Sequence, residues 1–416
     1  MTNPNIFKKQ ACAVISGIFS RNNNSIESTG NFNTHPLGSL VEEIKLLNKN
    51  KACDLVITNS AEYGIVPQKD FFDRNIAQEV HVDKYTIVEN GDFVYNPRIS
   101  KNAPAGPINR SHLNQGIVSP LYTVFRVNSD LVIGDYLECY FASGHWVAYA
   151  KSVANYGARH DRMNITNDDF FNMPIPVPDL EEQQKIAEFF TALDEKIRIA
   201  ENQLELLESA YKALMAQVFL KNNNESIWQT IKLKDICKRV TRKNTDNRCD
   251  IPLTISSADG LVNQLSYFSK KIASKDMSKY YLLKRGEFAY NKSYSSGYDF
   301  GSIKRLKLFD EGALSTLYIC FSIDCVNNEY MEYYFDSLSW YKNISKLCGE
   351  GARNHGLLNI GTSDFFDMEL TIHKSPVDQE KIVNLFSCFS KKVSTLKQRV
   401  LLYKQLKKAF MQRMFV

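Results

Sequence analysis

The sequence predicts an α+β protein: two similar mixed α/β domains separated by two long antiparallel coiled-coil helices, with pseudo-two-fold symmetry. Three observations predict this fold. They are an internal repeat of about 195 residues, an abrupt change to helix-forming sequence after Pro178 and again after Pro376, and a heptad pattern in both helix-forming stretches. The length of 416 residues alone corresponds to about three ordinary domains. The repeat replaces that estimate with one unit used twice.

The repeat consists of six short matches that follow the same order in both halves. Gly91–Asn96 matches Gly286–Asn291, an offset of 195 (286 − 91). The other five matches have offsets of 194 to 196: Leu121-Tyr122 with Leu317-Tyr318, Tyr136–Phe141 with Tyr330–Phe335, Trp146 with Trp340, Gly157–Arg159 with Gly351–Arg353, and Asp169–Phe171 with Asp364–Phe366. Such order at nearly one offset indicates a duplicated unit, and therefore two similar surfaces in one chain.

In chain order, five segments are predicted. Residues 1–24 resemble a displaced end of the helical repeat, because Ile18–Asn24 echoes Val218–Asn224. Residues 25–178 and 223–374 are aromatic-rich, with short β-branched runs bounded by Gly, Asn, Asp and Pro, so we expect short strands mixed with a few helices. Residues 179–222 and 375–416 contain no Gly, and no Pro beyond Pro376, and are predicted as long helices that begin at a proline.

The two predicted helices carry a heptad seam, in which apolar residues are spaced alternately by four and three positions. A seam sustained for more than four repeats is typical of coiled-coil packing. The residues expected to pair the helices are Ile186, Phe190, Leu193, Ile197, Leu204 and Leu207 in the first, and Ile382, Phe386, Phe389, Val393, Leu396 and Val400 in the second. Lys407 interrupts the second seam, where its stem could pack while the ammonium reaches solvent. Two ordinary amphipathic core helices remain the alternative interpretation.

Charge distinguishes the two helices, although the whole chain has a net charge of only +5. Residues 179–222 contain nine acidic and five basic side chains, and residues 377–416 contain two acidic and nine basic ones. The helices are therefore complementary partners. At about 1.5 Å per residue, residues 182–219 would span roughly 57 Å, so the pair is predicted to be a spacer between the two domains.

Composition excludes several classes of protein and of site. With 44% hydrophobic and 23% charged residues, the chain is neither collagen-like nor disordered. Its nine scattered cysteines include no Cys-x-x-Cys pair, and its histidines have no metal-ligand spacing, so we expect a reduced, cytoplasmic protein without a metal site. Neither a signal peptide nor an apolar run of membrane-spanning length is recognisable, so no membrane partner is expected.

No catalytic motif is found. The sequence lacks a phosphate-binding Gly-x-x-x-x-Gly-Lys-Ser/Thr loop and a Gly-x-Gly-x-x-Gly loop. Asn96-Pro97-Arg98 departs from the Asn/Asp-Pro-Pro-aromatic string of amino-methyltransferases, and Glu43-Ile44-Lys45 has no matched aspartate of a nuclease pattern. We therefore expect no catalytic residue, no bound cofactor and no enzymatic activity from this chain alone.

Basic and amide residues in the two domains instead suit nucleic-acid binding. Arg and Lys anchor to phosphates, and Arg and Asn also pair with base edges in the major groove. The candidates are Asn96, Arg98, Lys101, Arg110, Arg159, His160 and Arg162 in the first domain, and Asn291, Lys292, Tyr294, Lys304, Arg305, Arg353, Asn354 and His355 in the second. Because the framework motifs match while the loops between them differ, the pattern fits two readers of different sequences on one scaffold.

The start of each long helix carries a family resemblance. Glu182-Gln183-Gln184-Lys185-Ile186 opens the first helix and Asp378-Gln379-Glu380-Lys381-Ile382 opens the second. A Glu-Gln-x-x-Ile helix start that occurs twice, each time after a variable domain, resembles the specificity subunit of type I restriction–modification systems, over essentially the whole chain. Asp378 in place of glutamate and Lys407 in the seam make the second helix less typical.

The resemblance implies that the two domains are target recognition domains, each reading one half of a split double-stranded DNA sequence. It implies that the helices fix the gap between the half-sites, and that two S-adenosylmethionine-binding modification subunits and further restriction subunits assemble on the chain. It also implies that the specificity subunit has no catalysis of its own.

Two other functions stay open from the residues alone. One is a self-contained DNA methyltransferase or nuclease with an unrecognised site, and the other is a coiled-coil adaptor that binds only proteins. We predict that Arg159→Ala or Arg353→Ala weakens DNA binding without unfolding the chain.

Overall fold

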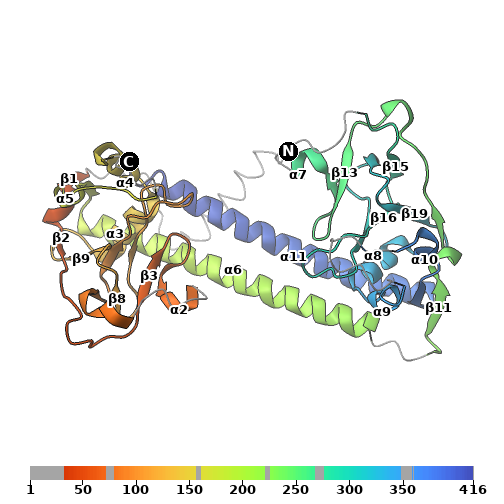
Figure 1. The fold of residues 1–416 in the computed structure, drawn as a ribbon, viewed down its shortest axis with the longest axis horizontal. Coiled ribbons are helices and arrows are strands. Elements are labelled where there is room, and N and C mark those ends of the chain that lie inside the picture. The colour runs from red at the N-terminus through yellow and green to blue at the C-terminus, as the bar shows by residue number, and fades with distance from the viewer. Residues whose placement is uncertain are drawn as a thin grey trace. The chain divides into compact units, whose positions relative to one another are not determined.

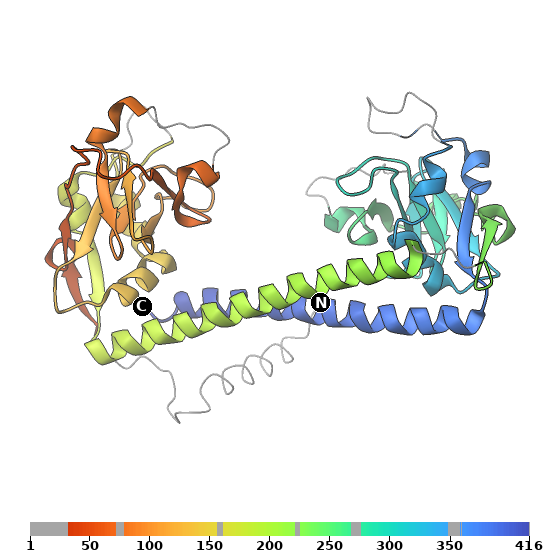
Figure 2. The same cartoon turned by 90° about the horizontal axis from the view of Figure 1, so that it is seen from below.

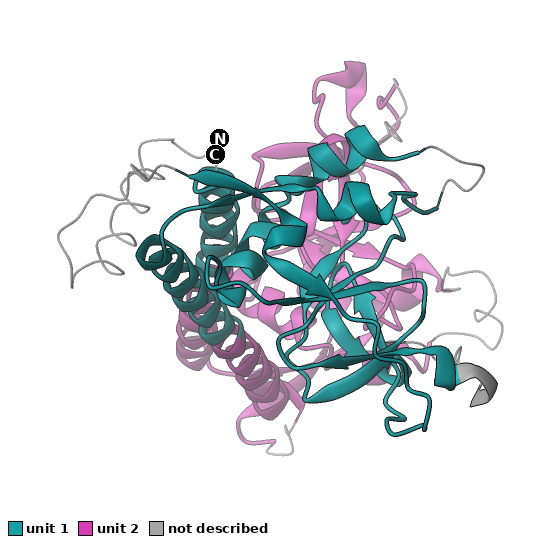
Figure 3. Cartoon of the chain, turned by 90° about the vertical axis from the view of Figure 1, so that its left-hand side faces the viewer, with its two compact units in different colours: residues 1–201, 398–416 teal, residues 202–397 magenta. Residues whose placement is uncertain are grey.

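The structure is a computed structural model that describes residues 32–71, 79–155, 161–220, 225–267, 276–347, 358 and 360–415. The chain divides into two compact units, Met1–Glu201 with Gln398–Val416, and Asn202–Lys397 (Figure 3). The first unit therefore contains the first domain, the start of the first long helix and the end of the second. The predicted N-terminal segment 1–24 lies outside the described residues.

The first unit alternates short strands with short helices (Figure 1). Its elements are β1 (Asn33–Pro36), η1 (Leu37–Ser39), β2 (Val41–Glu43), β3 (Ile57–Ser60), β4 (Gly64–Pro67), α2 (Gln68–Phe71), η2 (Glu79–Lys84), β5 (Thr86–Glu89), β6 (Phe93–Tyr95), β7 (Ile108–Arg110), β8 (Gln115–Val118), β9 (Thr123–Val127), α3 (Gly134–Ser143), α4 (Trp146–Val153), α5 (Asn167–Phe171), β10 (Pro174–Val177) and the long α6 (Leu180–Leu220). The sheet order is β2-β9-β6-β7, with the pairs β3-β4, β5-β8 and β1-β10 beside it.

The second unit repeats this order. Its elements are β11 (Trp228–Lys232), η3 (Leu233–Asp235), β12 (Cys237–Arg239), η4 (Thr245–Asn247), β13 (Pro252–Ser256), β14 (Gly260–Asn263), α7 (Gln264–Tyr267), β15 (Tyr281–Lys284), β16 (Phe288–Asn291), β17 (Ser302–Arg305), β18 (Glu311–Leu314), β19 (Ile319–Ile323), α8 (Asn328–Asp336), α9 (Tyr341–Ile344), α10 (Thr362–Phe366), β20 (Glu369–His373) and the long α11 (Pro376–Met411). The sheets β12-β19-β16-β17 and β11-β20 correspond to β2-β9-β6-β7 and β1-β10 of the first unit, whereas β14-β13-β18-β15 is one four-stranded sheet in place of the separate pairs β3-β4 and β5-β8.

The matched aromatic residues form the core between the central sheet and the helices. On β6, Phe93 and Tyr95 face the helices, whereas Val94 between them packs in a second core with β3, β5 and β8, as alternation along a strand requires. The Phe93 and Phe125 rings stack at 5.4 Å, and their counterparts Phe288 and Phe321 stack at 5.5 Å. Each domain is thus a layer of helices, a central sheet and a second layer of strands.

The two long helices run antiparallel within each unit (Figure 2). In the first unit, Lys407 Nζ pairs with Asp194 at 2.6 Å and Lys404 Nζ pairs with Glu201 at 2.7 Å, and in the second unit Lys397 Nζ pairs with Glu208 at 2.7 Å. Across these pairs the residue numbers rise along one helix and fall along the other, which shows that the two helices are antiparallel. The α+β class, the two similar mixed domains and the antiparallel helices are therefore confirmed.

The seam residues differ in burial along the helices. Ile186, Phe190, Leu193, Ile197 and Phe386 are buried because their helix ends also pack on a domain. Ile382 is half-buried against the core of the second unit. The other half-buried residues are Leu204, Leu207, Phe389, Val393, Leu396 and Val400. At the seam position of Lys407, the ammonium group pairs with Asp194 of the other helix.

The second helix ends earlier than its sequence pattern predicts. It stops at Met411, and the N–H groups of Arg413 and Met414 donate to Phe410 O at 2.9 Å in a final turn. The chain then inserts Met414 and Phe415 into the core of the first unit, where the Phe415 ring stacks on Phe190 at 6.2 Å. Burial of these two apolar side chains stabilises the turn over a further helical turn.

Candidate nucleic-acid interface

A tight turn fixes the strand that carries the first predicted binding residues. Gly91 adopts φ of +92°, a conformation that favours glycine, and Asp92 accepts a hydrogen bond from Glu89 N at 2.8 Å. Gly286 has the same φ of +92°, and Glu287 accepts from Lys284 N at 2.8 Å. The repeated Gly-Asp/Glu-Phe sequence therefore forms a turn that sets the register of β6 and β16.

The last residue of each framework motif organises the loop that follows. Asn96 Oδ1 accepts a hydrogen bond from Arg98 N, and Asn291 Oδ1 accepts one from Ser293 N, both at 3.0 Å. The backbone oxygens of Asn96 and Asn291 lie against Gly106 and Gly301, where a Cβ atom would collide with them. Predicted candidates Asn96 and Asn291 are therefore positioning residues whose side chains shape the loops.

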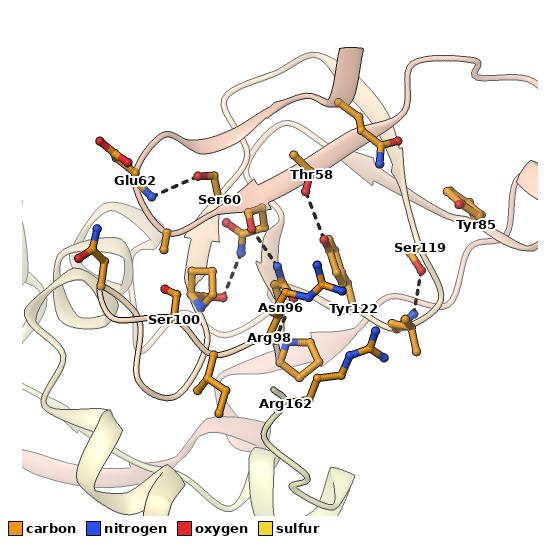
Figure 4. A pocket seen from close by; sticks show the side chains of 18 residues that line it. Thr58, Ser60, Glu62, Tyr85, Asn96, Arg98, Ser100, Ser119, Tyr122 and Arg162 are labelled. Carbon is orange, nitrogen blue, oxygen red and sulfur yellow. Dashed lines mark hydrogen bonds between the residues drawn. The ribbon is translucent and has the colours of Figure 1, made fainter. Parts of the chain in front are cut away.

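In the first unit this loop forms one wall of a cavity of about 530 Å³ (Figure 4). Arg98 and Arg162 both line the cavity and lie opposite each other as an antiparallel bridge pair. The other polar lining residues come from the β3–β4 hairpin and the neighbouring loops: Thr58, Asn59, Ser60, Glu62, Gln68, Tyr85, Asn96, Ser100, Asn102, Ser119 and Tyr122. The structure thus brings three of the predicted binding candidates, Asn96, Arg98 and Arg162, together around one cavity.

The floor of the cavity is a rigid amide network around Asn59. The Asn59 side chain, which is buried, donates to Val94 O at 2.6 Å and to Pro107 O at 3.0 Å, and its Oδ1 accepts from Asn109 Nδ2 at 2.6 Å. Asn96 Nδ2 donates to Asn59 O at 3.0 Å. Every polar atom of the Asn59 side chain is used in the fold, so the arginines, and not this amide, are the groups that the cavity offers to a ligand.

The two arginines have little internal charge compensation. Arg98 makes no ion pair with any described residue, and the only one of Arg162 is with Asp161 at 3.8 Å. Both arginines line one cavity, so an anionic group placed there would interact favourably with both. The five donors on each planar guanidinium group suit phosphate oxygens or a guanine edge.

Three other candidates serve the fold instead. Arg110 on β7 pairs with Asp135 and Glu138 of α3, and Arg305 on β17 pairs with Glu329 and Glu332 of α8. Lys304 Nζ pairs with Asp336 at 2.7 Å. These ion pairs hold a helix on the edge strand in both units, which assigns the three cations a structural role.

The remaining candidates divide into exposed and undescribed residues. Lys101 and Tyr294 are exposed, and Lys292 is half-buried with its backbone oxygen accepting from Leu358 N at 3.0 Å. Five candidates lie outside the described residues: Arg159, His160, Arg353, Asn354 and His355. In the described parts of the chain, no group of three or more His, Cys, Asp or Glu residues is placed to hold a metal ion, and no helix is long and apolar enough to span a membrane.

Structural pairs earlier in each domain extend the repeat beyond its sequence matches. Asn48 bonds to both the N–H and the oxygen of Cys53, and Asn244 bonds in the same way to Cys249. The Thr58 and Tyr122 hydroxyls lie 3.2 Å apart, and those of Thr254 and Tyr318 lie 3.4 Å apart. In the sequence these equivalent residues are identical at an offset of 196, but they are isolated and form no continuous motif.

The repeated helix-start motif anchors the helix to its domain. Gln183 is fully buried, its Oε1 accepts from Ile133 N at 2.9 Å, and its Nε2 donates to Leu131 O and Pro178 O at 2.8 Å. Gln379 is 5% exposed and donates to His373 O at 2.7 Å. The glutamine of the motif is therefore a structural clamp between helix and domain.

Comparisons with known proteins find partial sequence matches. A family model described as the type I restriction modification DNA specificity domain matches residues 83–209. The specificity subunit of the type I restriction enzyme HindI from Haemophilus influenzae is 29% identical over 109 residues, which are 26% of this chain. Both matches are to type I restriction–modification specificity proteins, and the family model covers less than a third of this chain. The aligned part spans only 23% of the length of that curated relative.

Solved structures with a similar fold align over nearly the whole chain. The S subunit of a type I restriction–modification system from M. genitalium has a TM-score of 0.55 at 13% identity, with 94% of this chain and 98% of that chain covered. A structure from a study of assembly and conformational transition in a type I system has a TM-score of 0.54 at 13% identity, with 94% and 99% covered. At such identity the likeness shows the fold alone.

Proposed function

We propose that this chain is the non-catalytic DNA-recognition subunit of a type I restriction–modification complex. Each domain reads one half of a bipartite DNA target, while the paired helices set the spacing and dock two modification subunits that bind S-adenosylmethionine. Restriction subunits complete the assembly.

One observation carries the proposal: a single backbone framework occurs twice with different residues around the candidate binding loop. Arg98, two residues after Asn96, corresponds to Ser293, and Asn59 in the cavity floor corresponds to Ile255. Strand register and core aromatics are retained, while the difference between Arg98 and Ser293 lies in the loop that lines the cavity of the first unit. Two different readers joined in one chain suit a target made of two different half-sites.

The first test is the methylation pattern that the complete locus confers on a host. We expect single-molecule sequencing to find methylation at one split motif, with a fixed gap between its halves. A continuous, unsplit motif would contradict the proposal. Methylation or cleavage of DNA by the isolated chain, given S-adenosylmethionine or Mg²⁺, would contradict its non-catalytic part.

The second test addresses the cavity of the first unit. In the complex with modification subunits, Arg98→Ala and Arg162→Ala should each weaken DNA binding about tenfold and reduce the salt dependence of the binding constant by about one phosphate contact. Arg198→Ala is the matched control, because Arg198 is exposed on α6 and pairs with Glu195. Equal effects of all three substitutions would show that the cavity arginines act only through net charge.

A further inference from the structure

Two exposed leucines occupy the same position in the two units. Leu121 lies in the turn between β8 and β9 and is 56% exposed, and Leu317 lies in the turn between β18 and β19 and is 72% exposed. They are related by an offset of 196 (317 − 121). Single exposed leucines are common on protein surfaces and need no explanation. A pair at equivalent positions of a duplicated unit is different, because both units retain an apolar side chain where packing does not require one.

Both turns are built in the same way to present this side chain. The Leu121 N–H donates to Ser119 Oγ at 3.4 Å and the Tyr122 N–H donates to Ser119 O at 3.0 Å. The Leu317 N–H donates to Ser315 Oγ at 3.4 Å and the Tyr318 N–H donates to Ser315 O at 3.2 Å. The following tyrosine is tied to Thr58 or Thr254 in the neighbouring strand. Each leucine is therefore held outward on a rigid support.

The surroundings of Leu121 indicate what it touches. Leu121 lines the same cavity as Arg98 and Arg162, and Ser119 and Tyr122 of its turn also line it (Figure 4). If the ligand is a nucleic acid whose phosphates bind the arginines, its bases would present an apolar surface to the leucine. That surface consists of thymine methyl groups and the faces of the bases.

We infer that Leu121 and Leu317 are a pair of apolar contacts to the DNA bases, one in each half-site. This inference rests on the proposed function, since it requires that both domains face the same duplex. It explains why the leucine is common to both units while Arg98 is not. An apolar contact to the face of a base is tolerant of sequence, because every base has such a face, so it contributes affinity in both half-sites, and the differing residues supply the discrimination.

The test uses the full chain in complex with its modification subunits and a labelled duplex that contains the wild-type methylation motif. Leu121→Ala and Leu317→Ala should each weaken binding about tenfold. The double variant should weaken it about a hundredfold, because the two contacts are independent. The slope of binding against salt should stay unchanged, because no phosphate contact is lost. Leu121→Met should bind within about threefold of wild type.

Matched controls are two exposed leucines outside these turns, Leu131→Ala in the first unit and Leu308→Ala in the second, which are 51% and 63% exposed. Both should bind DNA as wild type does. Unchanged affinity of the double variant beside a wild-type complex that binds would overturn the inference. Loss of modification subunits from the double variant in size-exclusion chromatography would also overturn it, because the leucines would then contact protein. A wild-type complex that binds no duplex would instead overturn the proposed function itself.

Discussion

Replacing the buried glutamine of the helix-start motif should destabilise one unit strongly while its sequence neighbour has no effect. Gln183→Ala removes the side chain that satisfies Ile133 N, Leu131 O and Pro178 O. At about 0.5 to 1.5 kcal/mol for each net hydrogen bond, the loss is roughly 1.5 to 4.5 kcal/mol. For a unit of about 200 residues, each kcal/mol lowers Tm by roughly 2 to 4 °C. We therefore expect a Tm lower by about 3 to 18 °C.

The same motif provides a graded series of controls. Gln379→Ala in the second unit removes the single hydrogen bond to His373 O and should cost about 1 kcal/mol. Gln184→Ala changes an exposed residue that only bonds to Glu188 one helical turn away, and should change stability by less than about 0.5 kcal/mol. All three substitutions remove the same amide, so burial and bonding alone distinguish them.

Differential scanning calorimetry of the full chain measures the series, and hydrogen exchange assigns each change to a unit. Protection should fall around β10 and the start of α6 for Gln183→Ala, and around β20 and the start of α11 for Gln379→Ala. Equal Tm values for Gln183→Ala and Gln184→Ala would refute the assignment of the motif glutamine as a clamp. Loss of modification-subunit binding with unchanged Tm would mean that Gln183 serves that contact instead.

Two further predictions concern the helices and the thiols. A double-mutant cycle of Lys407→Ala with Asp194→Ala should give a coupling of about 0.5 kcal/mol that declines in 1 M salt, as for a half-exposed ion pair, and a coupling that is independent of salt would contradict this account. Burial raises the pKa of the Cys139, Cys237 and Cys320 thiols to about 12, so only about one in 10⁴ of these thiols is a thiolate at pH 8. Peptide mass spectrometry should therefore find that iodoacetamide labels the exposed Cys325 and Cys388 before these three. Equal labelling of all five cysteines would contradict the buried placement of the three.

The duplication and the long helices could be predicted because their signals are local. Phe93 and Phe288, or Ile186 and Ile382, match at a nearly constant offset, and a heptad seam is visible in any window of two turns. The layering of each domain could not be predicted in this way. Val94 faces a different core from its neighbours Phe93 and Tyr95, and the strands that cover it come from distant parts of the chain.

The candidate site was harder to predict for the same reason. Arg98 and Arg110 look alike in sequence, as basic residues near loops, yet one lines the cavity and the other pairs with α3. What separates them is an acidic partner about 25 residues further along, on a helix whose docking the sequence does not reveal. Asn59 was missed altogether, because a single asparagine in a short strand carries no pattern.

The turn before β6 and β16 shows where the two units are constrained and where they are free. Asp92 is held by Arg126 of β9 at 2.6 Å, whereas its counterpart Glu287 is held by Arg242 at 2.7 Å, from the loop after β12. The carboxylate position and the backbone N–H that it accepts are retained, while the cation comes from a different part of the fold. An arginine that can come from a different part of the fold is needed to balance the charge of the carboxylate, and its position in the sequence can vary. By contrast, Arg98 and Ser293 differ at a position that lines the cavity in the first unit, so on the proposed function their difference concerns what each unit binds.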